Sequence, residues 1–226
     1  MYNSAPVLEC RSVSRKYDLS PVLRDVSLRL FSGERLALTG PSGSGKTTLL
    51  NCLGGIDRPD SGSVLIGGED LTRIDGEELA MLRRRKIGNV FQFFHLLPTL
   101  SVRENVEFPL LLLGVAPAQR RERAGSLLER VKMGHRAEAL PSRLSGGEMQ
   151  RCAIARALVH SPRVILADEP TGNLDSVNSA NILELLQELS GEMETALVLV
   201  THSEEAARIC QREVRMRDGV LEEVRG

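Results

Sequence analysis

Residues 40–47 constrain this chain more than any other stretch, because they read Gly-Pro-Ser-Gly-Ser-Gly-Lys-Thr and fit the pattern G-x-x-x-x-G-K-[ST]. An apolar run at residues 36–38 predicts a buried strand before the loop, and leucines along residues 47–53 predict a helix after it. Glycines between them let backbone N–H groups turn inward around an anion, where the helix dipole also favours negative charge. A flexible Gly/Ser turn is the alternative, but the strand-loop-helix context favours a nucleoside triphosphate site.

In such a site Lys46 reaches the β- and γ-phosphates, and the hydroxyl of Thr47 binds Mg²⁺. The other nucleotide-binding candidates of this loop are Gly40, Pro41, Ser42, Gly43, Ser44, Gly45 and Thr48.

Composition excludes several classes of function. A formal net charge of −1 over 226 residues gives no reason to expect nucleic-acid binding, and 3% aromatic residues offer few stacking platforms. Four scattered cysteines without a C-x-x-C motif indicate reduced thiols. Residues 1–6 show no signal-peptide pattern, and the longest apolar run, residues 108–116, is far shorter than the ~18–20 residues that a membrane span needs.

Hydrophobic periodicity predicts an α/β fold. The expected strands cover residues 7–10, 22–31, 35–38, 63–68, 86–92, 164–167 and 196–200, with a hairpin over 214–224 that turns at Asp218-Gly219. The expected helices cover residues 77–85, 102–113, 118–133, 146–159 and 176–189. We therefore expect a P-loop NTPase core with a parallel sheet, an antiparallel β N-terminal subdomain and an inserted α-helical subdomain.

Two carboxylates follow the apolar run at residues 164–167. The carboxyl end of a buried strand is where ligands bind in open α/β sheets. Asp168 suits a carboxylate that helps to hold Mg²⁺ beside the loop, and Glu169 suits the group that orients and polarises an attacking water. An acidic loop after a strand is the alternative, which the upstream phosphate loop disfavours.

A second glycine-hinged helix start lies at residues 144–151, which read Leu-Ser-Gly-Gly-Glu-Met-Gln-Arg. Ser145 can cap the helix, while Gly146 and Gly147 allow a ligand to approach the backbone closely. This helix N-terminus is shaped to hold an anion. An ordinary capping box between Ser145 and Glu148 explains the same residues and would usually be the better interpretation.

In five motifs together the chain resembles an ATP-binding-cassette (ABC) ATPase. They are GPSGSGKTT, LSGGEMQR, VILADE, Gly-Asn-Leu-Asp at 172–175 and Val-Thr-His at 200–202. The motifs occur in that family's order along nearly the whole chain. Within that family, the chain is most similar to the LolD/MacB branch, which includes FtsE-like proteins. The segments that indicate this branch are FQFFHLLPTLSVRENVEFPLLL and ADEPTGNLD. The resemblance implies a single nucleotide-binding domain over residues 1–226, with its helical subdomain at about 93–160.

The resemblance also implies further site residues. Tyr17 would stack on the adenine, although a surface tyrosine in a turn is the alternative. Gln92 would sense Mg²⁺ and the attacking water, and His202 would contact the γ-phosphate. Asp175 would lie in the loop that crosses to a partner subunit, and it is also a good N-cap for the next helix. The implied catalytic residues are Glu169, His202, Lys46 and Gln92; the implied metal-binding residues are Thr47, Gln92 and Asp168.

The family assembles as a head-to-tail dimer around two ATP molecules. The resemblance implies that the second helix start would face the γ-phosphate held by the other copy, through Ser145, Gly146, Gly147 and Glu148. The implied ligands are ATP and Mg²⁺, and the implied partners are a second copy and a membrane permease at the cytoplasmic face of the inner membrane. The branch implies export or lipoprotein and lipid extraction. The alternative is an FtsE-like ATPase that drives a permease-like partner in cell-envelope signalling without transport.

The apolar loop at residues 93–98, Phe-Phe-His-Leu-Leu-Pro, has two interpretations. Packing inside the helical insertion would bury it. If it is exposed, it forms a patch suited to a partner's helix, and the family places permease docking in this region.

Overall fold

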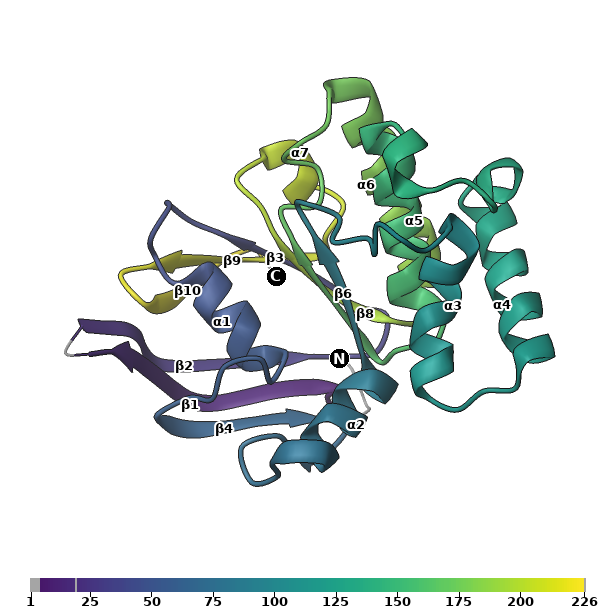
Figure 1. Cartoon of the computed structure of the whole chain (residues 1–226). Coiled ribbons are helices and arrows are strands. Elements are labelled where there is room, and N and C mark those ends of the chain that lie inside the picture. Colours follow the sequence, from purple (N-terminus) through teal and green to yellow (C-terminus); the bar gives the residue numbers. More distant parts are fainter. Residues whose placement is uncertain (1–4, 19, 226) are drawn as a thin grey trace.

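The computed structural model describes residues 5–18 and 20–225 (Figure 1), so most of residues 1–6, where the signal-peptide prediction falls, lie outside the described part. Its strands are β1 (Leu8–Tyr17), β2 (Ser20–Leu30), β3 (Arg35–Thr39), β4 (Ser61–Ile66), β5 (Glu69–Asp70), β6 (Ile87–Phe91), β7 (Val164–Asp168), β8 (Ala196–Val200), β9 (Arg212–Arg217) and β10 (Val220–Arg225). Its helices are α1 (Lys46–Leu53), α2 (Gly76–Lys86), α3 (Val102–Leu112), α4 (Pro117–Arg130), α5 (Gly146–Leu158), α6 (Ser176–Glu192) and α7 (Glu204–Ala207), with short 3₁₀ turns at Gly134–Arg136 and Pro141–Arg143.

A six-stranded sheet in the order β10-β9-β3-β8-β7-β6 forms the centre of the fold. Strands β9, β3, β8, β7 and β6 are parallel, and β10 returns antiparallel to β9 through a turn at Asp218 and Gly219, which both have positive φ. Every residue of β8 is buried, as expected for a strand covered on both faces. The predicted α/β fold with a parallel sheet is confirmed.

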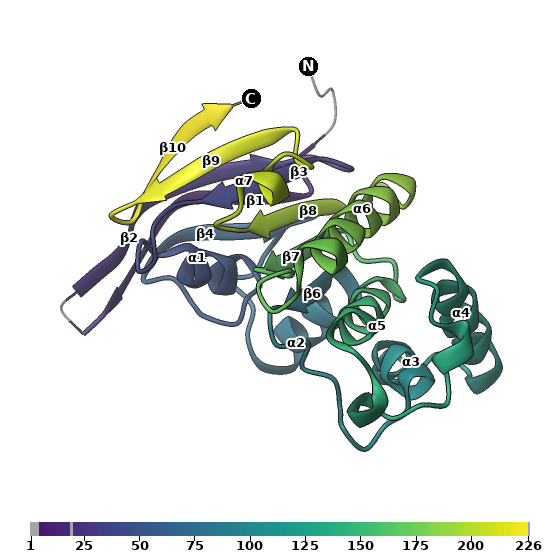
Figure 2. The same ribbon diagram turned by 90° about the horizontal axis from the view of Figure 1, so that it is seen from above.

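Alternating side chains give this sheet a buried cluster on each face. Leu36 and Leu38 of β3 join the cluster that contains α1 and the second sheet, whereas Ala37 joins the cluster that contains α5 and α6. In β8, Leu197 and Leu199 point to the same side as Ala37. Figure 2 shows the result from above, with α5 and α6 beside the sheet on the face away from α1. Because successive side chains of a strand point to opposite faces of the sheet, each strand contributes to both buried clusters.

The second sheet, in the order β2-β1-β4-β5, is antiparallel and confirms the predicted antiparallel N-terminal part. Strand β1 continues to Tyr17, well beyond the predicted residues 7–10, because register shifts after Cys10 interrupt the alternation that sequence patterns rely on. Figures 1 and 2 both place α3 and α4 at the end of the molecule opposite the β1–β2 hairpin.

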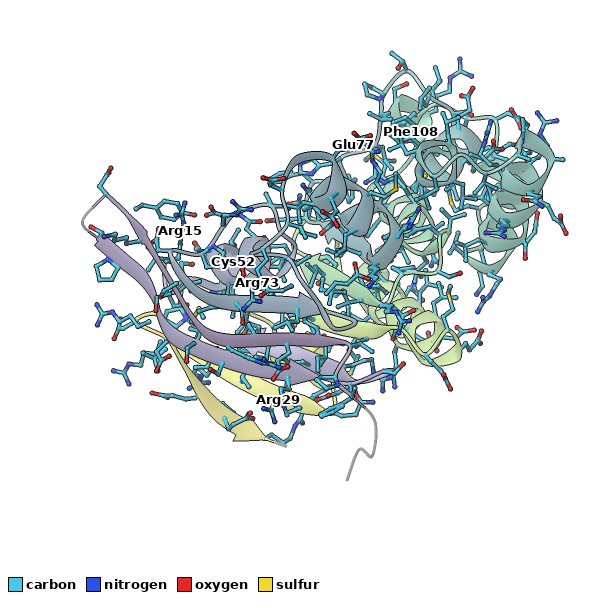
Figure 3. The ribbon with its side chains drawn as sticks, turned by 90° about the horizontal axis from the view of Figure 1, so that it is seen from below. Arg15, Arg29, Cys52, Arg73, Glu77 and Phe108 are labelled. Atoms are coloured by element: carbon cyan, nitrogen blue, oxygen red, sulfur yellow. The ribbon has the colours of Figure 1, made fainter. Side chains whose placement is uncertain are left out.

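The sequence patterns missed β5, α7 and the two 3₁₀ turns, which are all too short to show a period. Helix α7 begins at a capped residue, since the side chain of Ser203 accepts a hydrogen bond from the N–H of Ala206. The four cysteines are buried free thiols, as expected, and burial raises the pKa of the Cys52 thiol, labelled in Figure 3, to about 12.

Strand β6 and helix α5 approach closely at Gly88, where an added Cβ would lie 2.3 Å from the carbonyl oxygen of Ala157. We expect Gly88→Ala to lower the free energy of unfolding by about 1–3 kcal/mol, because neither backbone can move away without disturbing the core. Urea denaturation of the nucleotide-free chain measures this value.

The matched control is Gly125→Ala in α4, where an added Cβ meets nothing within 4 Å. There the free energy of unfolding should rise by roughly 0.5–1 kcal/mol, since alanine is the better helix former. Equal effects of the two substitutions would contradict the close approach at Gly88.

Candidate active site

Parallel pairing brings the ends of four strands to one edge of the sheet. Leu38 pairs with Val200, Val200 with Asp168, and Asp168 with Phe91. The residues that follow β3, β8, β7 and β6 therefore emerge together, as ligand sites in open α/β sheets do. These segments contain most of the candidate site residues, namely those of the loop at 40–47, Asp168, Glu169, His202 and Gln92.

Lys46 lies inside its own loop. Its Nζ donates hydrogen bonds to the carbonyl oxygens of Gly40 and Pro41, both at 2.9 Å, and only 5% of the residue is exposed. Burial lowers the pKa of this ammonium, while the carboxylates of Glu169 and Asp168 act in the opposite direction. The loop thus surrounds a buried cation, whose hydrogen-bond partners among the described residues are carbonyl oxygens.

The loop backbone requires its glycines. Gly40 has φ 137°, and a Cβ there would lie 2.2 Å from the carbonyl oxygen of Met216. Gly43 has φ 77°, and a Cβ there would meet nothing within 4 Å, so its backbone faces open space. The buried hydroxyl of Ser44 has no hydrogen-bond partner among the described residues. An exposed backbone, an unpaired hydroxyl and a buried cation fit a phosphate-bearing ligand.

Thr47 and Asp168 place two oxygen atoms beside this loop, 3.3 Å apart, with the hydroxyl of Thr47 donating to Asp168. Burial raises the pKa of the Asp168 carboxyl, and the Thr47 hydrogen bond opposes this shift. A hydroxyl and a desolvated carboxylate are oxygen ligands of the kind that Mg²⁺ prefers. The residues present therefore fit the cation that the sequence implies.

Glu169 and His202 are in contact, with 2.9 Å between Oε1 and Nε2. Glu169 has φ 44°, an uncommon conformation for a residue with a side chain, and its N–H donates to the carbonyl oxygen of Val200. This hydrogen bond ties the end of β7 to the end of β8. Strained backbone of this kind occurs at functional sites when the surrounding structure holds it in place.

Gln92 contacts Asn173, which the sequence analysis did not assign a role. The Gln92 amide donates to Oδ1 of Asn173 at 3.2 Å, and the Asn173 amide donates to the Gln92 carbonyl oxygen at 2.9 Å. Gly172 allows this contact, because a Cβ there would lie 2.8 Å from Nε2 of Gln92. Asn173 lies within the Gly-Asn-Leu-Asp segment, but nothing in the sequence pairs it with Gln92, which is 81 residues away.

The helix start at Ser145 contains the capping box that was the alternative interpretation. The Ser145 hydroxyl accepts from the N–H of Glu148, and the Glu148 carboxylate accepts from the N–H of Ser145 at 2.8 Å. This backbone hydrogen bond lowers the pKa of Glu148 most, and Arg136 contributes as an ion-pair partner. A Cβ on Gly146 would meet Leu174, Phe94 and Asn173 first, so within one chain this element packs against the segment before α6.

Asp175 is the N-cap of α6. Its carboxylate accepts hydrogen bonds from the backbone N–H and the side-chain amide of Asn178. The predicted capping role is therefore present, and the role across a subunit interface stays a prediction.

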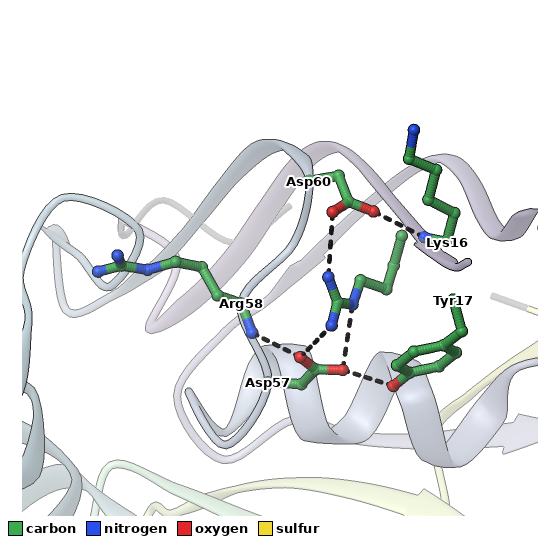
Figure 4. Close-up of polar contacts among 6 residues, drawn as sticks. Lys16, Tyr17, Asp57, Arg58 and Asp60 are labelled. Atoms are coloured by element: carbon green, nitrogen blue, oxygen red, sulfur yellow. Dashed lines mark hydrogen bonds and ion pairs between the residues drawn. The ribbon is translucent and has the colours of Figure 1, made fainter. Parts of the chain in front are cut away.

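Tyr17 stands at the end of β1 with 44% of its surface exposed. Its hydroxyl donates to Asp57 (Figure 4). The guanidinium of Arg15 lies 4.9 Å from the ring centroid. Arg15 also pairs with Asp57 and Asp60. These contacts fix the orientation of the ring while leaving it accessible, as a stacking platform requires. Asp57 is 40 residues away in sequence, so no local pattern indicated it.

Over the part of the chain that the structure describes, no helix is long and apolar enough to cross a membrane.

Comparison with known proteins agrees with this geometry. The ABC transporter family model matches residues 23–172, more than half of the chain. The lipoprotein-releasing system ATP-binding protein LolD of Pseudomonas fluorescens is 48% identical over 219 residues, which cover 95% of this chain and 96% of that protein. The macrolide export ATP-binding/permease protein MacB of Syntrophobacter fumaroxidans is 47% identical over 222 residues, although the chain spans only 31% of that longer protein.

Among solved structures, the dimeric bacterial ABC transporter cassette MJ0796 superposes with a TM-score of 0.87 at 40% identity, covering 97% of this chain and 99% of that chain. A second structure of the same cassette, in a dimeric post-hydrolysis state bound to ADP and Pi, gives a TM-score of 0.87 at 39% identity. The chain therefore belongs to the ABC transporter family, as one of its ATP-binding and ATP-hydrolysing subunits.

Proposed function

We propose that this chain powers a separate membrane permease for lipoprotein or lipid extraction, through ATP-driven closure of two copies. The observation that carries the proposal is the convergence of Lys46, Asp168, Glu169 and His202 at one sheet edge, together with a second anion-suited helix start at Ser145. The name of the LolD relatives, lipoprotein-releasing system ATP-binding protein, supports the cargo class.

The phosphate loop binds and orients the triphosphate. Its N–H groups and Lys46 take the β- and γ-phosphates, and the ammonium exchanges the carbonyl oxygens of Gly40 and Pro41 for phosphate oxygens. Thr47, Asp168 and Gln92 would hold Mg²⁺, which supplies charge neutralisation of the phosphates. The ring of Tyr17, fixed by Asp57, would stack on the adenine.

Glu169 acts on the attacking water. The water oxygen forms a bond to the γ-phosphorus, the bond to the bridging oxygen of ADP breaks, and the water proton passes to the carboxylate. His202 lies beside Glu169. It would donate to the γ-phosphate, and its contact with Glu169 would then open. Positioning and charge stabilisation supply most of the acceleration.

Each site is completed by a second copy. The N-terminus of α5, with Ser145, Gly146 and Gly147, would face the γ-phosphate that the other copy holds, and Asp175 would lie in the segment that crosses between them. The dimeric MJ0796 structures support this arrangement. Closure then follows ATP binding, because the cross-subunit contacts exist only in the closed state.

The loop at residues 93–98 is the proposed permease contact. Phe93 is 67% exposed, and the next two residues are held by Arg156, which donates to the carbonyl oxygens of Phe94 and His95. An exposed aromatic ring on a fixed loop suits a helix of a membrane partner. Such a partner would place the chain at the cytoplasmic face of the inner membrane. The MacB relative carries ATP-binding and permease functions in one protein, which supports this pairing.

Replacing Glu169 by Gln should lower ATP turnover by about a hundredfold or more, because the amide cannot accept the water proton. ATP affinity should be retained, and an ATP-bound dimer should accumulate, visible by size-exclusion chromatography. Glu188→Gln on the exposed face of α6 is the control and should leave turnover unchanged. Normal turnover in Glu169→Gln would remove the proposed role.

Ser145→Arg should abolish ATP-dependent dimerisation and leave the ATP affinity of the monomer within about twofold, because the bulky cation occupies the interface and not the phosphate loop. Loss of the cap costs about 1 kcal/mol, so stability is measured in parallel. Ser145→Asp keeps an oxygen acceptor at the cap but loses the hydroxyl that donates to Glu148. It places a negative charge against the partner's phosphate, so it should also block dimerisation. A dimer formed by either variant in a Glu169→Gln background would contradict the composite site.

Asp168→Asn should raise the Tm of the nucleotide-free chain by a few degrees at neutral pH, because it removes a buried charge whose pKa is raised by burial. The difference should shrink as the pH falls through the folded pKa of Asp168 towards its ordinary value of 3.8, since the parent carboxyl then becomes neutral as well. Differential scanning fluorimetry against pH measures this, with the exposed Asp75→Asn as control. A pH-independent difference would contradict the desolvation argument.

A further inference from the structure

Gln150 is a fully buried polar residue that the proposed mechanism does not use. It lies in the second turn of α5, and 0% of its surface is exposed. A buried amide is costly unless it is hydrogen-bonded. Oε1 of Gln150 has no partner among the described residues, so the partners of Nε2 show what holds the side chain there.

Those partners are two backbone carbonyls at the catalytic edge. Nε2 of Gln150 donates to the carbonyl oxygen of Pro170 at 2.7 Å and lies 3.4 Å from that of Phe91. Pro170 directly follows Glu169, and Phe91 directly precedes Gln92. Because β6 and β7 are neighbours in the sheet, one amide spans the ends of both strands.

The same helix holds the next part of the loop after β6. Arg156, six residues after Gln150 in α5, donates to the carbonyl oxygens of Phe94 and His95. Burial lowers the pKa of this guanidinium, which is partly buried. The segment from 91 to 95 is thus attached to α5 at three carbonyls, and Gln150 is the residue that also attaches α5 to the end of β7.

Helix α5 begins at Ser145, the element proposed to meet the nucleotide of the other copy. A helix is stiff over this length, so a displacement at Ser145 reaches Gln150, five residues on. Through Gln150, this displacement reaches the backbone of the residue after Glu169 and of the residue before Gln92.

We propose that Gln150 is a positioning residue for ATP hydrolysis. Its amide holds the carbonyl oxygens of Pro170 and Phe91, next to Glu169 and Gln92. It thereby fixes the positions of Glu169 and Gln92 relative to α5, the helix proposed to contact the nucleotide of the other copy. This inference depends on the proposed function, because it acts through Glu169. Over the described residues, the hydrogen bonds of Gln150 go to Phe91 and Pro170 and not to the phosphate loop, so we expect it to affect the rate of the chemical step and not ATP affinity.

The test uses Gln150→Met in the full chain, which keeps the length of the side chain and removes its donors. We expect kcat to fall at least tenfold, with KM for ATP and the affinity for a fluorescent ATP analogue within twofold of the parent. ATP-dependent dimer formation in the Gln150→Met, Glu169→Gln double variant should persist. Gln187→Met on the exposed face of α6 is the matched control and should retain parental kinetics.

A kcat within twofold of the parent would overturn the proposal, and so would an equal loss of kcat and nucleotide affinity, which indicates general structural damage. If Gln150→Met does not fold, Gln150→Asn decides: it keeps the amide but withdraws it from both carbonyls, and parental kcat in that variant also overturns the proposal. Normal turnover in Glu169→Gln would instead remove the proposed function itself, so the two failures are distinguishable.

Discussion

Parallel pairing of β3, β8, β7 and β6 is the constraint on which the rest of this structure depends. The pairs Leu38 with Val200 and Asp168 with Phe91 align four strand ends at one edge. A slip of one residue in any strand would turn its apolar side chains to the wrong cluster, because the two buried layers alternate along each strand. The same packing that makes the fold stable therefore fixes the positions of the phosphate loop and the acidic residues.

Electrostatics at that edge favour ligand binding over stability of the free chain. Burial lowers the pKa of Lys46 and raises the pKa of Asp168, so both charged forms are disfavoured where they stand. Lys46 is satisfied by carbonyl oxygens of its own loop, and Ser44 has an unpaired buried hydroxyl among the described residues. A triphosphate with its cation would relieve these costs together, which is the expected arrangement at a functional site.

Helix α5 connects the parts of the molecule that an ATP cycle must coordinate. Its N-terminus at Ser145 is rigid because a capping box fixes it, its second turn carries Gln150 against the strand ends, and Arg156 holds the loop beside the exposed Phe93. Movement of a docked permease and closure on ATP would thus act on one stiff element. Such coupling needs a rigid element whose position both sites influence.

Sequence alone determined the features that depend on neighbouring residues. These are the phosphate loop with Lys46, the two carboxylates after a buried strand, the capped helix at Ser145, and the parallel sheet from its apolar runs. Each depends on neighbouring residues and on periods that appear in the chain itself. Tertiary structure decided the contacts between distant segments, such as Asp57 on Tyr17, Asn173 on Gln92, and Gln150 on the carbonyl of Pro170. No sequence pattern pairs these residues with one another, because each contact joins segments that are distant in the chain and that only packing brings together.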